Sequence, residues 1–303
     1  MNAAPQPPFG RVVTAMVTPF DDNGELDVDA AADLARHLVR HGSDALCIAG
    51  TTGEAPVLTD PERLRLVRAV VEAVADTATP VLAGMTTNDT LHSVGLVEQA
   101  ADLGAAGILA VTPYYNRPSQ SGLHGHFAAI AGATDLPVIL YDIPVRTGRK
   151  IATETILELR AACSNIIGVK DASGDPATTA RLLVADPDLL VYSGDDGLTL
   201  PLLAVGAAGV IGVATHWVGE RMARMIEAYK SGSVDVARQE NAAMIESFEF
   251  ETSERWPNPL PTKAILRAMG LKVGQCRLPL GPADAELDTR AGVLAAQLGL
   301  VGA

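Results

Sequence analysis

The feature that most constrains the fold of this chain is a regular alternation of short apolar runs with longer amphipathic segments. Eight apolar runs have the length and composition of β-strands, and patterns of helical length generally lie between them. This alternation predicts a parallel sheet whose strands are joined by helices. The strand-like runs are residues 12–17, 45–49, 80–84, 107–111, 137–141, 166–170, 189–193 and 209–213. The helical patterns cover about 28–41, 60–76, 89–103, 122–133, 152–162, 175–185, 197–206 and 218–230.

Eight β/α units predict an α/β fold of the closed (β/α)8 barrel type, the TIM barrel. We expect the barrel to cover residues 1–233, and residues 234–303 to form a C-terminal helical domain that extends it. An open, doubly wound sheet is the alternative. Such a sheet would more often carry a Gly-x-Gly-x-x-Gly turn after its first strand, and residues 13–20 lack that turn. The barrel is therefore the preferred prediction.

Charge and composition argue against several classes of partner. Hydrophobic residues make up 48% of the 303 residues, which is enough for a large buried core. The net charge of −13 leaves no basic face for nucleic acid. Residues 1–8 lack the apolar core of a signal peptide, and no apolar stretch is continuous enough to span a membrane. Cys47, Cys163 and Cys276 are widely spaced, so we expect three reduced thiols in a cytoplasmic protein that binds neither nucleic acid nor membranes.

Residues suited to chemistry gather where the predicted strands end. The active site of a (β/α)8 barrel is assembled from the loops at the carboxyl ends of its strands, so this clustering supports the barrel prediction. Lys170 closes the sixth strand. The other segments are Gly50-Thr51-Thr52-Gly53-Glu54 after the second strand, Thr112-Pro113-Tyr114-Tyr115-Asn116 after the fourth, residues 141–148 after the fifth, Ser193-Gly194-Asp195-Asp196 after the seventh and Gly212-Val213-Ala214-Thr215 after the eighth.

Lys170 is the first candidate for a catalytic residue. It follows the apolar run 165–169 and precedes residues 171–174, which have the composition of a turn. A lysine at the carboxyl end of a buried strand is where a barrel would place an amine for Schiff-base chemistry. Because an amine attacks a ketone only when it is uncharged, this chemistry requires an apolar surrounding. A lone lysine in such a place is more often an ordinary surface residue, and the neighbouring motifs favour the catalytic interpretation.

Taken together, the motifs resemble those of the 4-hydroxy-tetrahydrodipicolinate synthase family, also called dihydrodipicolinate synthase. The order and spacing agree over nearly the whole chain, in residues 50–54, 112–118, 141–148, 168–173 and 193–196. The family belongs to a wider group of pyruvate-dependent class I aldolases and lyases that includes N-acetylneuraminate lyase. The resemblance implies a condensation of pyruvate with L-aspartate 4-semialdehyde to 4-hydroxy-tetrahydrodipicolinate, in lysine and diaminopimelate biosynthesis. The alternative is a related lyase, either N-acetylneuraminate lyase or a 2-keto-3-deoxy sugar acid aldolase.

The resemblance implies roles for four catalytic residues. Lys170 would form an imine with pyruvate, and no other cofactor would be needed. Tyr141, Thr52 and Tyr115 would form a relay of hydroxyl groups, which suits protons that must move both ways. Each of the three also has a purely structural interpretation. Tyr141 could pack at a strand end, Thr52 could cap a turn, and Tyr115 could pack in an interface.

The resemblance also assigns residues to substrate binding. Thr51 and Thr52 would lie near the carboxylate of pyruvate, and Gly194 and Ile211 would offer backbone carbonyls to the second substrate. Arg146 favours the synthase over the sugar-acid lyases. A guanidinium binds a carboxylate in a bidentate manner, and aspartate semialdehyde brings a carboxylate to the site. Without the motif, Arg146 could equally be a surface arginine in a loop.

A metal-dependent aldolase is the other chemical alternative. Asp195 and Asp196 could hold Mg²⁺, and His124 with His126 could hold Zn²⁺. The aspartates, however, stand where a helix would need a cap, and histidines two apart on a helix face different sides. We therefore expect no metal.

Assembly and regulation are further implications of the resemblance. In the family Tyr115 would reach across a dimer interface, which predicts a homodimer that is commonly doubled to a homotetramer. Lysine-inhibited relatives carry two histidines and a carboxylate at a second site. Here those positions hold Asp60, Arg63 and His92, although Asn88 and Tyr114 match. Because the acceptor for an ammonium group is missing, we expect weak or absent inhibition by lysine.

Overall fold

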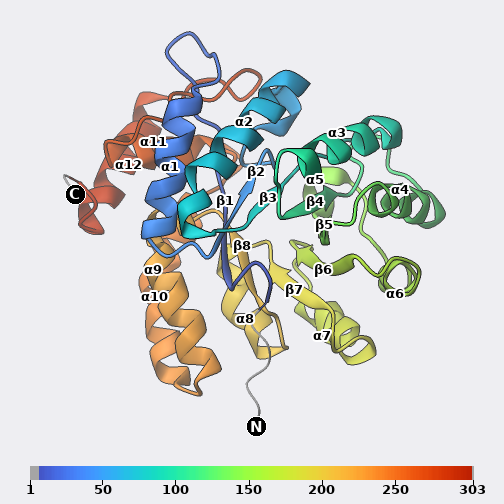
Figure 1. Cartoon of the computed structure of the whole chain (residues 1–303). Helices are drawn as coiled ribbons and strands as arrows, with labels where there is room; N and C mark the ends of the chain where they lie inside the picture. Colours follow the sequence, from blue (N-terminus) through green and yellow to red (C-terminus); the bar gives the residue numbers. More distant parts are fainter. Residues whose placement is uncertain (1–6, 302–303) are drawn as a thin grey trace.

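The computed structural model describes residues 7–301 as a closed barrel of parallel strands, with neighbouring strands in the order β1 to β8 (Figure 1). The barrel prediction is confirmed, and the open sheet is excluded because β1 pairs with β8, where Val13 lies opposite Ile211. The strands are β1 (Val12–Ala15), β2 (Ala45–Ile48), β3 (Val81–Ala83), β4 (Gly107–Val111), β5 (Val138–Asp142), β6 (Ile166–Asp171), β7 (Leu190–Ser193) and β8 (Gly209–Gly212).

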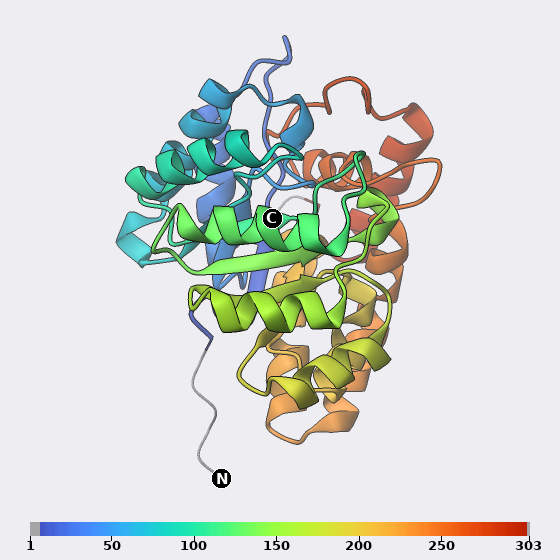
Figure 2. The ribbon, with the colours of Figure 1, turned by 90° about the vertical axis from the view of Figure 1, so that its right-hand side faces the viewer.

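Helices on the outside of the barrel connect successive strands. Figure 2 shows this layer from the side, where α3, α4, α6 and α7 follow one another around the barrel. The helices up to the last strand are α1 (Val28–Arg40), α2 (Asp60–Ala73), α3 (Thr90–Asp102), α4 (Gln120–Gly132), α5 (Pro144–Thr147), α6 (Thr153–Ala162), α7 (Pro176–Ala185) and α8 (Thr199–Ala204). After β8 come α9 (Thr215–Lys230), α10 (Val234–Phe250), α11 (Leu260–Ala268) and α12 (Ala285–Gln297).

Local sequence explains where several helices begin. Thr59 precedes α2 and forms a capping box with Glu62, because the Glu62 side chain accepts from the Thr59 backbone N–H at 2.8 Å. Asp27 and Asp89 cap α1 and α3 through their side chains. Pro61 stands in the first turn of α2, where no intrahelical bond needs its missing N–H.

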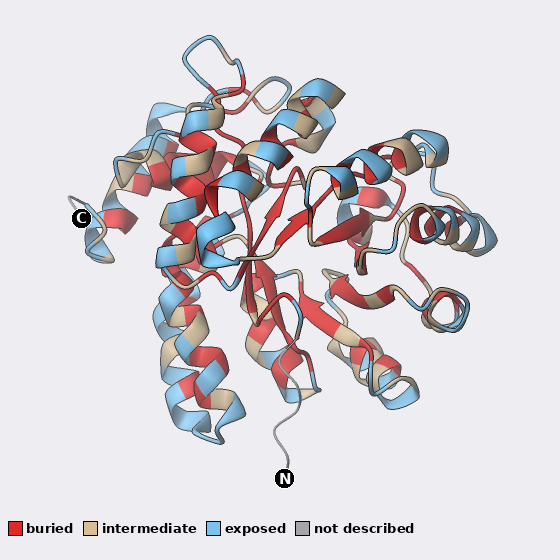
Figure 3. Ribbon diagram, in the orientation of Figure 1, coloured by how far each residue is buried: buried red, intermediate tan, exposed pale blue. Residues whose placement is uncertain are grey.

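The strands are buried on both faces, which explains why they are nearly continuous apolar runs (Figure 3). One cluster fills the inside of the barrel and includes Val13, Leu82, Ile139, Tyr192 and Ile211. A second cluster lies between the strands and the helices α1 to α4, α6 and α7, whose inner faces are buried while their outer faces are exposed. The barrel is therefore packed with side chains, and functional groups have to lie at its ends.

The C-terminal segment 234–301 is mainly helical and packs against the barrel. Val210 of β8 shares a hydrophobic cluster with Met225 of α9, Met244 of α10 and Ile265 of α11. The division into a barrel of 1–233 and a helical domain of 234–303 stays a prediction. Cys47, Cys163 and Cys276 are free cysteines. Over residues 7–301, none of the helices combines the length and apolar character that crossing a membrane would require.

Candidate active site

A cavity of about 230 Å³ opens at the carboxyl ends of the barrel strands. Residues from four successive loops line it. Thr51 follows β2, Thr86 follows β3, Tyr114 follows β4, and Tyr141 and Arg146 come from β5 and the loop after it. This is the end of the barrel at which the sequence predicted the site.

Lys170 is the next-to-last residue of β6, and only 4% of it is exposed. It lies opposite Tyr141 of β5 and Tyr192 of β7 in the sheet register. Its Nζ lies 4.3 Å from the centre of the Tyr141 ring. A side chain at Gly194 would come within about 3 Å of the aliphatic part of Lys170. The structure thus brings Lys170, Tyr141 and Gly194 together, and a residue larger than glycine at 194 would push against the lysine.

Thr52 is buried in the loop between β2 and α2. Its Oγ1 accepts a hydrogen bond from Asn258 Nδ2 at 2.9 Å. The loop is held at Gly53, whose carbonyl accepts from the Thr18 hydroxyl at 2.6 Å. Glu54 adopts a left-handed backbone conformation and makes a buried ion pair of 2.7 Å with Lys263 of α11. The position of Thr52 is therefore fixed, by Asn258 directly and by the contacts of Thr18 and Lys263 with the next two residues of the loop.

Tyr115 is placed differently from the other relay candidates. It is 90% exposed, has a φ of 73°, and does not line the cavity of its own chain. The neighbouring side chain of Asn116 donates from Nδ2 to the carbonyl of Asn88 at 3.0 Å, which fixes this loop. A single chain thus brings Tyr141 to the cavity but leaves Tyr115 facing solvent.

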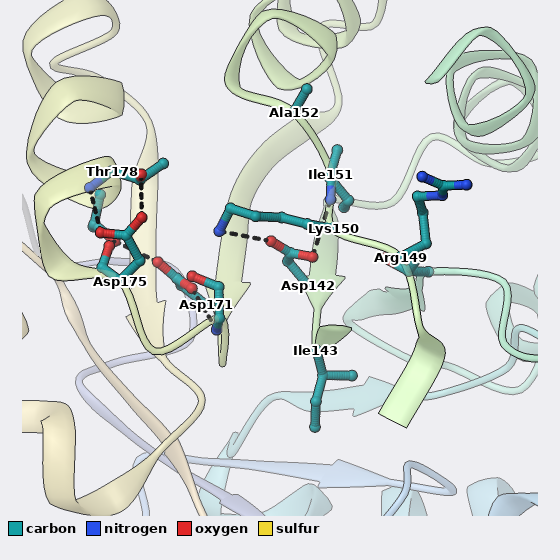
Figure 4. Close-up of polar contacts among 12 residues, drawn as sticks. Asp142, Ile143, Arg149, Lys150, Ile151, Ala152, Asp171, Asp175 and Thr178 are labelled. Atoms are coloured by element: carbon teal, nitrogen blue, oxygen red, sulfur yellow. Dashed lines mark hydrogen bonds and ion pairs between the residues drawn. The ribbon is translucent and has the colours of Figure 1, made fainter. Parts of the chain in front are cut away.

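Arg146 lies in the short helix α5 and lines the cavity. Its Nη2 donates to the backbone carbonyl of Asn258 at 3.2 Å. The base of its loop is closed by Asp142, which accepts from the backbone N–H of Ile151 at 3.1 Å and lies 3.4 Å from Lys150 Nζ (Figure 4). Arg149, in the same loop, points away from this cluster. The structure thus directs one of the two neighbouring arginines to the cavity.

Burial changes the acidity of Asp142. Desolvation raises the pKa of the Asp142 carboxyl to about 6, although the Ile151 N–H and Lys150 both favour the charged form. Asp142 alternates with Tyr141 along β5, as Asp171 alternates with Lys170 along β6, so the acidic pair faces away from the barrel interior. Asp142 is therefore a support for the site and not part of its cavity.

Ile211 is the third residue of β8, and its side chain belongs to the interior cluster. Neither Ile211 nor Gly194 lines the 230 Å³ cavity. Contact between their backbone carbonyls and the second substrate stays a prediction.

The aspartates after β7 have protein partners. Asp195 accepts from the Leu198 N–H at 3.2 Å as a cap, and Asp196 accepts from the Val213 N–H at 2.7 Å. Burial raises the pKa of Asp196 and of nearby Glu251, and the charge of Asp196 raises the pKa of Glu251 further. Within the part of the chain that the structure describes, no three His, Cys, Asp or Glu side chains form a group that could hold a metal ion.

The histidines of α4 are also accounted for by packing. His126 is buried, with Nδ1 2.9 Å from the Thr90 hydroxyl, and burial lowers its pKa to about 4. His124 is partly exposed on another side of the helix.

A separate cavity of about 290 Å³ lies between α1 and α9. It contains the buried His216, whose two ring nitrogens already contact the backbone at Val17 and Val213.

Sequence reasoning did not assign Asn258 to the site. Asn258 lies just before α11, which begins at Leu260, and not at the end of a barrel strand. Asn258 nevertheless contacts both Thr52 and Arg146. No local pattern in the sequence marks these contacts, because the partners of Asn258 lie 206 and 112 residues away in the chain.

Comparison with known proteins agrees with the motifs. The model of the dihydrodipicolinate synthetase family matches residues 8–297. A 4-hydroxy-tetrahydrodipicolinate synthase from Moorella thermoacetica is 49% identical over 97% of this chain and 99% of its own length. The enzyme of that name from Acidothermus cellulolyticus is 52% identical over 93% and 90%. The crystal structure of the Cyanidioschyzon merolae synthase with lysine bound superposes with a TM-score of 0.93, at 44% identity over 97% of this chain and 99% of that one.

Proposed function

The chain belongs to the dihydrodipicolinate synthetase family, and from this premise we propose that it condenses pyruvate with L-aspartate 4-semialdehyde. The product is 4-hydroxy-tetrahydrodipicolinate, an intermediate of lysine and diaminopimelate biosynthesis. The observation that carries the proposal is the near-complete match to curated synthases over both chains. The buried Lys170 beside Tyr141 supplies the chemistry that such a reaction needs.

The reaction begins at the Lys170 amine. The nitrogen attacks the ketone carbon of pyruvate, and loss of water leaves an imine. Loss of a methyl proton converts the imine to an enamine, whose carbon forms a bond to the aldehyde carbon of the second substrate. The amino group of that substrate then displaces Lys170 from the imine carbon and closes the ring. The only group bound covalently is the substrate, so the mechanism uses no separate cofactor.

These steps need groups that both give and take protons. Tyr141 lies against the Lys170 amine, and the Thr52 hydroxyl is held in the adjoining loop. Tyr115 completes the relay from the partner subunit, which its 90% exposure on a single chain supports. The assembly is accordingly a homodimer, and pairing of two dimers gives a homotetramer.

Arg146 selects the second substrate. Its guanidinium lines the cavity, where it meets the carboxylate of aspartate semialdehyde. Thr51 lines the same cavity and binds the pyruvate carboxylate together with Thr52. Gly194 and Ile211 offer backbone carbonyls to the second substrate. This set favours the synthase over a sugar-acid lyase, which reads hydroxyl groups.

A coupled assay tests the proposed reaction. Purified protein is supplied with pyruvate and L-aspartate 4-semialdehyde, and the downstream reductase reports product through oxidation of its nicotinamide cofactor. We expect turnover that is unchanged by EDTA, and no cleavage of N-acetylneuraminate or of 2-keto-3-deoxy sugar acids. Cleavage of those sugar acids without condensation would assign the chain to the lyases, and loss of turnover in EDTA would restore the metal-dependent alternative.

A further inference from the structure

The segment between α10 and α11 connects the two halves of the site. It carries Asn258, which is 8% exposed. The Asn258 side chain donates from Nδ2 to Thr52 Oγ1 at 2.9 Å, and its backbone carbonyl accepts from Arg146 Nη2 at 3.2 Å. One residue thus contacts the proposed proton relay through its side chain and the proposed carboxylate-binding arginine through its backbone.

The orientation of the Asn258 amide is set by Thr262, a fully buried residue one turn further on. The Thr262 hydroxyl donates to Asn258 Oδ1 at 3.0 Å. With the carbonyl end of the amide engaged in this way, the NH₂ end faces Thr52. The opposite orientation would require the Thr262 hydroxyl to accept and the Thr52 hydroxyl to donate, which reverses both hydrogen bonds.

The first turn of α11 is itself fixed to the loop that carries Thr52. Lys263 Nζ lies 2.7 Å from Glu54 Oε1, and both side chains are almost completely buried. Lys263 also donates to the backbone carbonyl of Gln275 at 3.0 Å and lies over the Phe20 ring. Because this ion pair sits two residues from Thr52 and five from Asn258, the distance between the amide and the hydroxyl has little freedom to change.

The direction of the Thr52 hydroxyl follows from these contacts. A hydroxyl has one proton to donate and two lone pairs to accept with. Since Thr52 Oγ1 accepts from Asn258, its single proton is directed to another partner. In a relay, that proton is the one to be passed on.

We propose that Asn258 is a positioning residue, which holds the Thr52 hydroxyl as an acceptor on one side so that its proton serves the relay between Tyr141 and Tyr115. The inference rests on the proposed function, because it gives a direction to a relay which that function requires. Asn258 acts through Thr52, and its contact with Arg146 runs through the backbone and survives any change of side chain.

The test compares Asn258→Ala with Asn258→Asp. The readout is exchange of the pyruvate methyl protons with deuterium, followed by NMR without the aldehyde and normalised to the Lys170 sites that borohydride traps. Asn258→Ala should slow exchange and kcat between about tenfold and about 100-fold, with the KM for aspartate semialdehyde within about twofold of wild type. Asn258→Asp should be at least as slow, because a carboxylate accepts from Thr52 and turns its proton away from the relay.

A second pair of variants tests the same point without adding charge. Thr262→Val releases the amide and should slow exchange severalfold, while Thr262→Ser keeps the hydroxyl and should restore it. Thr252→Ala is the matched control. The Thr252 hydroxyl accepts from the Asn258 backbone N–H at 3.3 Å and does not contact the side-chain amide, so its loss should leave the direction of the Thr52 hydroxyl unchanged.

The outcomes separate this inference from the function on which it rests. Wild-type exchange in Thr262→Val, or a milder defect in Asn258→Asp than in Asn258→Ala, would overturn the positioning role and leave the synthase intact. If the wild-type protein forms no borohydride adduct with pyruvate, it is the proposed function that fails. Should Asn258→Ala fail to fold, the Thr262 pair decides the question.

Discussion

Replacement of Arg146 should separate binding of pyruvate from turnover. We expect Arg146→Ala to form the Lys170 imine normally and to lose between about 30-fold and about 1000-fold in kcat/KM for aspartate semialdehyde, since truncation leaves the substrate carboxylate without its partner. Imine formation is followed by borohydride trapping, and turnover by the coupled assay.

Arg149→Ala is the control for this prediction. Arg149 lies three residues away in the same loop, carries the same charge and points away from the Asp142 cluster (Figure 4). Wild-type kinetics are expected for it. An Arg146→Ala enzyme with wild-type kcat/KM would remove Arg146 from substrate selection and reopen the lyase alternative.

Asp142 should make the stability of the protein depend on pH. Its pKa is raised from 3.8 to about 6 by burial, so the folded state binds the proton more tightly than the unfolded state does. The stabilisation is therefore complete below about pH 4 and is lost as the pH rises through 6. The unfolding free energy of Asp142→Asn minus that of the wild type should therefore rise by about 2–3 kcal/mol as the pH goes from 4 to 7.

Urea unfolding at a constant subunit concentration measures this difference. Asp175→Asn serves as the contrasting variant. Hydrogen bonds from Thr178, first from its side chain and then from its backbone N–H, lower the pKa of Asp175. The stabilisation that Asp175 provides is therefore lost as the pH falls and not as it rises. If the difference in unfolding free energy between wild type and Asp142→Asn were the same at pH 4 and pH 7, the carboxyl would have the same pKa in the folded and unfolded states, and the prediction would be wrong.

At the scale of elements, hydrophobic pattern located all eight strands to within two residues at either end. Buried parallel strands are apolar along their whole length, so their runs stand out from the amphipathic helices. Helix boundaries were less well predicted where the backbone is irregular. α9 begins at Thr215, but Val218 interrupts it with a non-helical φ of −122°, so the amphipathic pattern that begins at 218 marks only the part of the helix after this kink. The segment predicted as a helix at 197–206 is a short turn followed by α8.

The residues of the site also differ in whether sequence patterns could predict them. The positions of Lys170, Tyr141, Thr51 and Arg146 could be predicted because each stands at or just beyond a strand end, whereas the roles of the last three are implied by the family resemblance. Asn258 and the Glu54–Lys263 pair could not, because they depend on contacts between segments about 200 residues apart. Such contacts leave no periodic pattern in the sequence, and only the folded chain brings them together.

Helices α2 and α3 carry the basis for a prediction about regulation. His92 Nε2 lies 2.9 Å from Asp60 Oδ2, so these two side chains engage each other. Arg63 is buried and donates from Nη2 to the carbonyl of Ala55 at 2.6 Å. The Arg63 cation and the Asp60 carboxylate, which is already bonded to His92, therefore form a poor site for the ammonium group of lysine.

We therefore expect less than half of the activity to be lost at about 1 mM lysine, with sodium chloride at the same ionic strength as the control. The coupled assay at several pyruvate concentrations measures it. Half-maximal inhibition at a submillimolar concentration would contradict this reading of α2 and α3.

At the scale of the whole molecule, Tyr115 predicts that two subunits share each site. Tyr115→Phe and Lys170→Ala should each be inactive alone. In a mixed dimer, the Lys170→Ala subunit donates its Tyr115 to the site that retains Lys170. Random pairing of equal amounts then restores about a quarter of the wild-type sites.

The two variants are mixed under conditions that let subunits exchange, and activity is followed together with mass by light scattering. Recovery towards a quarter supports the shared site. No recovery in a mixture that demonstrably contains mixed dimers would place Tyr115 in the site of its own chain, as would full activity in a monomer.

Reduction of the protein with borohydride in the presence of pyruvate, followed by mass spectrometry of its peptides, tests the central claim most directly. We predict one reduced pyruvate per subunit, carried by Lys170, and none in Lys170→Ala. A wild-type protein that turns over both substrates but carries no adduct on Lys170 would contradict the account.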